Sequence, residues 1–120
     1  MPQAQSYKNL IVWQKSMEVV SFVYSLTRKF PREEIFGITS QMRRSAVSIP
    51  SNIAEGSRRG SRKDYRNFML IAYGSGAELE TQLEISKREK FANLEACLKI
   101  ENLLDEVMRM LNKIVHELEA

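Results

Sequence analysis

The stretch IENLLDEVMRMLNKIVHEL, residues 100–118, decides the fold of this chain. Its apolar residues recur at alternating steps of four and three, which is the spacing of a helical face that packs in a bundle. The row consists of Ile100, Leu104, Val107, Leu111, Ile114 and Leu118. We therefore predict a helix over residues 94–118, with Asn93 as its N-cap.

The segment before this helix has the same periodicity. Ser61 and Asp64 are spaced as a capping box, which predicts a third helix over residues 62–90. Gly74 and Gly76 each cost about 1 kcal/mol relative to alanine inside a helix, a cost that is tolerable if another helix packs very close to them. The predicted buried face is Tyr65, Phe68, Met69, Ala72, Gly76, Leu79 and Leu83.

A second helix is predicted over residues 39–55, with Thr39 or Ser40 as its N-cap. Pro50 falls inside the apolar pattern and removes one backbone donor, so we expect a kink there. Gly56 is expected to end the helix. The core face of this helix is Ile38, Met42, Ala46, Ile49 and Ile53.

The first helix, predicted over residues 8–29, carries two apolar rows where a lone surface helix needs one. Either both rows belong to one broad core stripe, or part of the helix meets another subunit. Phe30-Pro31 ends this helix, because the residue before a proline avoids the α region. One row is Leu10, Trp13, Met17, Val20 and Tyr24, and the other is Val12, Val19, Val23, Leu26 and Phe30.

The composition favours one all-α domain over residues 1–120. Only five glycines and three prolines interrupt 120 residues, and 43% of the residues are hydrophobic. Four helices with short connections predict an up-down-up-down four-helix bundle. A single cysteine, Cys97, and the lack of a recognisable signal peptide fit a cytoplasmic protein. No apolar run approaches the roughly 20 residues of a membrane span.

Catalytic and metal-binding residues are scarce in this sequence. His116 is the one histidine, and it stands alone near the end of the last helix. Neither a zinc set nor a di-iron Glu-x-x-His pair can be assembled. Glu78, Glu80 and Glu84 fit a solvated or ion-paired face better than an acid/base pair. We therefore predict a protein that is not an enzyme, with no cofactor, no metal and no small-molecule substrate.

Positive charge gathers in the middle of the chain, although the net charge is only +3. Residues 43–66 hold seven basic residues and two acidic ones, whereas residues 78–120 are predominantly acidic. This segregation predicts a basic surface for an anionic partner, or a basic surface that meets an acidic one in self-assembly. The candidate nucleic-acid contacts are Arg43, Arg44, Arg58, Arg59, Arg62, Lys63 and Arg66.

A polar stripe shares one face of the second helix with Arg44 and lies away from its apolar residues. Its small hydrogen-bonding side chains differ from the Lys and Glu of an ordinary solvent face. We interpret the stripe as a helix–helix or subunit contact; the alternative is a solvated surface. Its members are Ser48, Ser51, Asn52 and Glu55.

Four short stretches of the sequence resemble a known family. Leu10-Ile-Val-Trp13 and Phe30-Pro31 are similar to its first helix, and Gly74-Ser-Gly-Ala-Glu78 follows further on. The most specific match is Ser48-Ile-Pro-Ser-Asn-Ile-Ala-Glu-Gly56. Together they resemble the bacterial four-helix bundle proteins encoded within intervening sequences of 23S ribosomal RNA genes, some of which are labelled ribosomal proteins. The resemblance covers residues 7 to about 118.

The resemblance implies a bundle that assembles as a homopentameric ring. Accessory proteins of diversity-generating retroelements have a similar architecture and bind nucleic acid through a basic surface. We therefore predict a homo-oligomer, a pentamer by this resemblance, that binds RNA or DNA with little base specificity. The alternative is a protein–protein scaffold in which the same arginines pair with an acidic helix of a neighbouring subunit.

Overall fold

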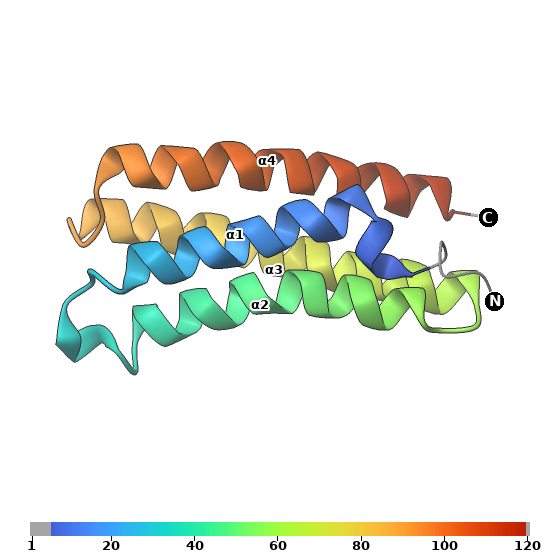
Figure 1. Cartoon of the computed structure of the whole chain (residues 1–120), viewed down its shortest axis with the longest axis horizontal. Helices are drawn as coiled ribbons and strands as arrows, with labels where there is room; N and C mark the ends of the chain where they lie inside the picture. Colours follow the sequence, from blue (N-terminus) through green and yellow to red (C-terminus); the bar gives the residue numbers. More distant parts are fainter. Residues whose placement is uncertain (1–5, 120) are drawn as a thin grey trace.

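Four long helices form the architecture (Figure 1). The computed structural model describes residues 6–119, in which α1 is Ile11–Thr27, α2 is Ile38–Ser57, α3 is Arg62–Arg88 and α4 is Leu94–Glu117. The helices run alternately up and down, and each packs against two others: α1 and α3 both contact α2 and α4. The prediction of an all-α chain with four helices in a compact bundle is confirmed.

The first two helices differ from the predicted ranges at their ends. A 3-10 turn, η2 (Tyr7–Asn9), replaces the predicted start of α1, and a second one, η3 (Arg32–Glu34), follows α1. The prediction of Thr39 or Ser40 as N-cap is wrong, because Gly37 occupies that position without a side-chain hydrogen bond. Thr39 lies in the first turn of α2 instead, where its side chain is buried in the bundle.

The other two helices begin where their caps place them. The Ser61 hydroxyl accepts a hydrogen bond from the Asp64 backbone N–H at 3.1 Å. The Asn93 side-chain oxygen accepts one from the Ala96 N–H at 3.0 Å. Each bond satisfies a helix N-terminal donor that has no partner within its own helix. Both N-cap predictions are confirmed; α3 ends two residues and α4 one residue before the predicted boundaries.

The bundle core takes one of the two apolar rows of α1. Val12, Val19, Val23 and Leu26 are buried, with Phe30 beyond the end of the helix. The other row lies outside the core: Leu10, Trp13, Val20 and Tyr24 are half-buried and Met17 is 41% exposed. The second row is therefore an apolar surface that this chain alone covers only in part.

The glycines separate into packed and open positions. Gly56 lies inside α2 rather than ending it, and a β-carbon there would be 2.7 Å from the Phe68 β-carbon on α3. A β-carbon at Gly76 would overlap the sulfur of Met108, so α4 does pack closely there. Nothing lies within 4 Å of the equivalent point at Gly74, so close packing does not account for the glycine at that position. Helix α2 continues through Pro50.

Candidate nucleic-acid interface

Five of the seven predicted basic residues lie around the α2–α3 connection. Arg58 and Arg59 follow α2, and three more basic side chains occupy the first two turns of α3. This end of the bundle also carries the C-terminal end of α4 (Figure 1). Arg66 is half-buried and the other four residues are exposed. We call these five the loop-end cluster: Arg58, Arg59, Arg62, Lys63 and Arg66.

The end of α4 holds two members of the loop-end cluster. An Arg62 Nη donates a hydrogen bond to the Glu117 carbonyl at 2.9 Å, and Arg66 Nε donates to the Val115 carbonyl at 3.1 Å. The Arg66 guanidinium also lies 3.5 Å from the Glu119 carboxylate. The last carbonyls of a helix lack intrahelical partners and carry its negative dipole end, so they attract cations. These contacts orient both arginines and use part of their hydrogen-bonding capacity.

Two other arginines of the cluster lie against aromatic rings. The Arg58 guanidinium is 5.4 Å from the centroid of the Tyr7 ring. The Arg59 guanidinium is 4.9 Å from the Phe68 centroid and forms an ion pair with Glu55 at 2.7 Å. Glu55 therefore offsets the charge of Arg59. Within residues 6–119, Arg58 and Lys63 form no ion pair and keep their charge open to an anionic partner.

A cavity of about 470 Å³ opens beside the cluster, between η2 and the α2–α3 connection. Its lining includes Arg59, Arg62, Ser61 and the rings of Tyr7 and Tyr65. Burial raises the pKa of the Tyr65 phenol above that of an exposed tyrosine. Tyr65 is half-buried, in agreement with the inward orientation that the sequence periodicity predicts. This part of the surface is thus concave and basic, without an exposed ring at Tyr65.

The remaining two predicted residues lie elsewhere on α2. Arg43 Nε donates to the Thr27 hydroxyl at 2.9 Å, and its guanidinium lies 4.6 Å from the Tyr24 centroid, so it packs on α1. Arg44 is exposed and lines a groove between α2 and α3 with Glu78. Helical rise puts Arg44 roughly 21 Å from Arg58. The structure does not bring all seven residues into one patch, because the rise along α2 separates Arg43 and Arg44 from the loop-end cluster.

The polar stripe of α2 divides between the interior and the surface. The hydroxyls of Ser48 and Ser75 are 2.8 Å apart and join α2 to α3. The Asn52 amide donates to the carbonyl and the hydroxyl of Ser48, at 2.8 and 2.9 Å. Ser51 is exposed, and Glu55 pairs with Arg59. Of the stripe, Ser48 alone therefore makes a polar helix–helix contact within the chain, and Asn52 supports it from the same helix.

The candidate residues for catalysis and metal binding are dispersed. His116 is exposed, and its Nδ1 is 2.8 Å from the Asn112 carbonyl. Cys97 is buried, and burial, followed by the nearby Glu101 charge, raises the pKa of its thiol. Over residues 6–119, no three His, Cys, Asp or Glu side chains are grouped to hold a metal ion. No helix in that range is long and apolar enough to cross a membrane.

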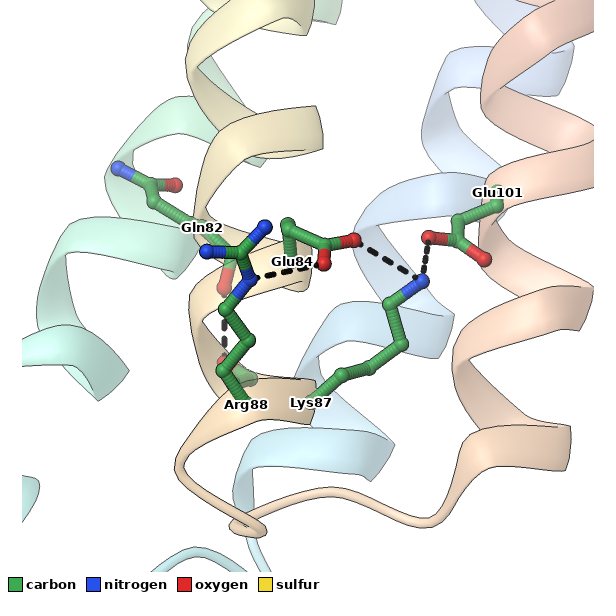
Figure 2. Close-up of polar contacts among 6 residues, drawn as sticks. Gln82, Glu84, Lys87, Arg88 and Glu101 are labelled. Carbon is green, nitrogen blue, oxygen red and sulfur yellow. Dashed lines mark hydrogen bonds and ion pairs between the residues drawn. The ribbon is translucent and has the colours of Figure 1, made fainter.

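Glu84 belongs to a charge network that links α3 to α4 (Figure 2). Lys87 Nζ lies 2.8 Å from the Glu101 carboxylate and 3.3 Å from that of Glu84, while Arg88 Nε donates to Glu84 at 3.1 Å. Hydrogen bonds from Arg88 and then Lys87 lower the pKa of Glu84. Hydrogen bonds to Glu101 and then Glu84 raise the pKa of Lys87. Glu84 is thus on an ion-paired face, as the sequence indicated.

We expect Lys87→Met to weaken the acid sensitivity of the fold. A carboxylate whose pKa is lowered by folding stabilises the native state above its unfolded pKa, and this contribution is lost as the pH falls through the folded pKa. The urea concentration at the unfolding midpoint of the wild type should therefore decrease once the pH is below about 4.5, the ordinary pKa of Glu84. In the Lys87→Met variant this decrease should be smaller. Lys113→Met, at an exposed lysine outside the network, is the control and should keep the wild-type profile. Identical profiles for all three proteins would contradict the expectation.

The raised pKa of Lys87 acts at the other end of the pH scale. Its stabilising contribution is complete below the unfolded pKa and is lost as the pH rises through the folded pKa, which lies above 10.5. The same pair of variants therefore tests both limbs of the pH profile, because Lys87→Met should also lose less stability than the wild type above about pH 10.5.

Comparisons with known proteins agree with this architecture. A family model described as 23S rRNA-intervening sequence protein matches residues 8–113. The chain is also similar to a crystallised protein of unknown function from the S23 ribosomal protein family of Bacteroides thetaiotaomicron, with 30% identity and a TM-score of 0.81. That similarity covers 88% of this chain and 98% of the other. A search of curated proteins gave no match. The resemblance drawn from the sequence is confirmed.

Proposed function

Because this chain belongs to the 23S rRNA-intervening sequence protein family, we propose that it is a non-enzymatic homo-oligomer that binds RNA or DNA through the loop-end cluster. It requires no cofactor and acts in the cytoplasm. The family resemblance described above suggests a homopentameric ring. The observation that carries the proposal is the grouping of five basic side chains at one end of the bundle, beside a concave basic surface.

The chemistry of the cluster suits phosphate. A guanidinium presents a planar fork of donors that matches phosphate oxygens, and four of the five residues are exposed. The α4 carbonyls already orient Arg62 and Arg66, so less side-chain entropy is lost when a phosphate binds. Contacts to phosphates position a nucleic acid without reading its sequence. The proposal is therefore binding with little base specificity.

Self-association would strengthen this binding. In a ring with cyclic symmetry, each copy carries its cluster in an equivalent position. A nucleic acid long enough to reach several clusters binds the second and later ones at a high effective concentration. We therefore expect affinity to increase with the length of the nucleic acid.

The test is the salt dependence of binding to a single-stranded RNA. Each phosphate contact contributes about 0.7 to the slope of log K against log salt concentration for single strands. Replacing Arg58, Arg59, Arg62 and Lys63 by alanine should reduce that slope by roughly 2 to 3 for each bound subunit. The charge-matched control replaces Arg28, Arg88, Lys90 and Arg109, which are exposed away from the loop-end cluster, and should keep the slope. A four-residue variant of the loop-end cluster with wild-type affinity and slope would refute nucleic-acid binding at this site.

A protein–protein scaffold is the second candidate, and the outer row of α1 favours it. Trp13, Met17, Val20 and Tyr24 form an apolar strip outside the core, and Val47 of α2 is 40% exposed. Partly exposed apolar side chains grouped on one helix are typical of protein interfaces. Light scattering on the loop-end variant separates the candidates. Dissociation to monomers would mean that the arginines hold subunits together, whereas an intact oligomer with weakened RNA binding supports the first proposal.

A further inference from the structure

Phe36 is the most exposed large apolar side chain of the described residues. It is 93% exposed, in the connection between α1 and α2, and its neighbour Ile35 is 46% exposed. Neither side chain belongs to the core of its own bundle. A fully exposed phenyl ring leaves a large apolar surface in water, and burying it elsewhere is favourable.

The same end of the bundle has a cavity that fits such a ring. It has a volume of about 410 Å³ and lies between the C-terminal half of α1 and the start of α4. Phe22, Leu26 and Phe91 give it apolar walls, and Lys29 and Lys99 also line it. Lys99 Nζ lies 5.6 Å from the centroid of the Phe22 ring, so positive charge lies next to the aromatic wall. We call this cavity the α1/α4 pocket.

The exposed ring and the pocket are on opposite sides of one chain. Phe36 borders the groove between α2 and α3 that contains Glu78 and Gln82. The pocket opens between α1 and α4, the two helices on the other side of the bundle. The α1–α2 and α3–α4 connections nevertheless lie at the same end (Figure 1). Phe36 therefore cannot fill its own pocket, but it lies at the level where a neighbouring copy would present one.

We propose that Phe36 of one copy inserts into the α1/α4 pocket of the next copy. The contact rests on the self-association in the proposed function and specifies the side chains that hold two subunits together. Such an interface joins two different surfaces, so it is heterologous and generates a ring when the rotation closes. Phe36 and the α1/α4 pocket lie at the same end of the bundle. Adjacent copies can therefore make this contact without being shifted relative to each other along the helix axis.

Charge supports a second copy as the occupant. Glu33 and Glu34 precede Phe36 in the connection, and the pocket presents Lys29 and Lys99. Complementary charges around an apolar contact fix its orientation and disfavour other partners. The pocket also contains one acidic residue, Glu95, and the connection contains one basic residue that could face it, Arg32.

The first test is the mass of Phe36→Ser in solution. We expect light scattering to shift from an oligomer toward the 13.9 kDa monomer, with helical content unchanged because Phe36 lies outside the core. Leu94→Ser is the control: Leu94 is 67% exposed at the same end of the bundle and does not line the pocket. It should keep the oligomer. A Phe36→Ser protein with wild-type mass would overturn the proposed contact.

The second test is disulfide formation between two single variants, Phe36→Cys and Ala96→Cys. Ala96 lines the pocket, and the native Cys97 is buried and unavailable to an oxidant. Mixing the variants under mild oxidation should give a covalent dimer, and Leu94→Cys mixed with Ala96→Cys should not. A wild type that is monomeric would refute the self-association itself. An oligomeric wild type without this cross-link would refute only the contact.

Discussion

Replacing Leu104 with alanine should lower the free energy of unfolding by about 2–5 kcal/mol. Leu104 is 0% exposed and lies in the middle of the α4 row that packs on the other helices. The substitution loses the transfer free energy of the removed methyl groups and leaves a cavity that the surrounding helices fill only in part. Urea denaturation followed by circular dichroism, at one fixed protein concentration, measures the change.

A leucine on the same helix provides the control for Leu104. Leu98 is 55% exposed, so Leu98→Ala removes the same atoms without opening a cavity, and its effect should stay within about 0.5 kcal/mol. A loss of less than about 0.5 kcal/mol at Leu104 would show that α4 does not bury the face described here. The comparison also tests whether Leu98 is covered by another copy, because a covered Leu98 would make its truncation costly.

The interior of the bundle was largely predictable because each of the last two helices has one apolar face along its length, and that face must point into the core. In α4 the row through Ile100, Leu104, Val107 and Leu111 is buried, and charged residues fill most of the opposite face. Ser61 and Asn93 could be identified as caps because a short polar side chain preceded each helical pattern. Periodicity, propensity and capping agreed at these positions, and such agreement makes a prediction reliable.

The first helix shows where periodicity alone fails. Both of its rows are apolar and both have helical spacing, so the sequence gives no reason to prefer Val19 over Val20 as the core residue. The choice depends on where α2 and α4 lie against the helix, which is a property of the whole bundle. The N-cap of α2 was missed for a related reason: Gly37 has no side chain that signals a helix start, and Thr39 was placed inside the bundle.

The candidate site was predictable as a set of residue types but not as a surface. Arg43 and Arg44 are close in sequence to the other arginines, yet α2 carries them about 20 Å away along its axis. The sequence also gave no sign that the α4 carbonyls would accept hydrogen bonds from Arg62 and Arg66, because those partners are about 50 residues apart. The exposure of Phe36 in the α1–α2 connection could not be predicted, because a single exposed aromatic residue outside a helix leaves no periodic pattern in the sequence.

The second large effect is expected at Gly56, where valine should destabilise the fold by about 3 kcal/mol, the upper end of the usual cost of overpacking. Even the first added carbon would lie 2.7 Å from the Phe68 β-carbon and 3.2 Å from Tyr65 Cδ1. A β-carbon is fixed to the backbone, so the clash with Phe68 can be relieved only if α2 and α3 move apart. The described chain has no glycine with a positive φ, so the loss would come from packing and not from backbone strain.

Gly74→Val is the matched control for Gly56→Val, because it places the same side chain in a helix where nothing lies within 4 Å of the new β-carbon. Valine has a somewhat higher helix propensity than glycine, so the control should be neutral or slightly stabilising. The difference between the urea midpoints of the two variants then measures the effect of packing separately from the effect of helix propensity. If Gly56→Val were as stable as Gly74→Val, the close approach of α2 and α3 at the base of the loop-end cluster would be disproved. The cluster depends on that approach, because Arg59 lies over the ring of the same Phe68 that excludes a side chain at Gly56. A variant that separates the helices should therefore also weaken RNA binding, although it removes no charge.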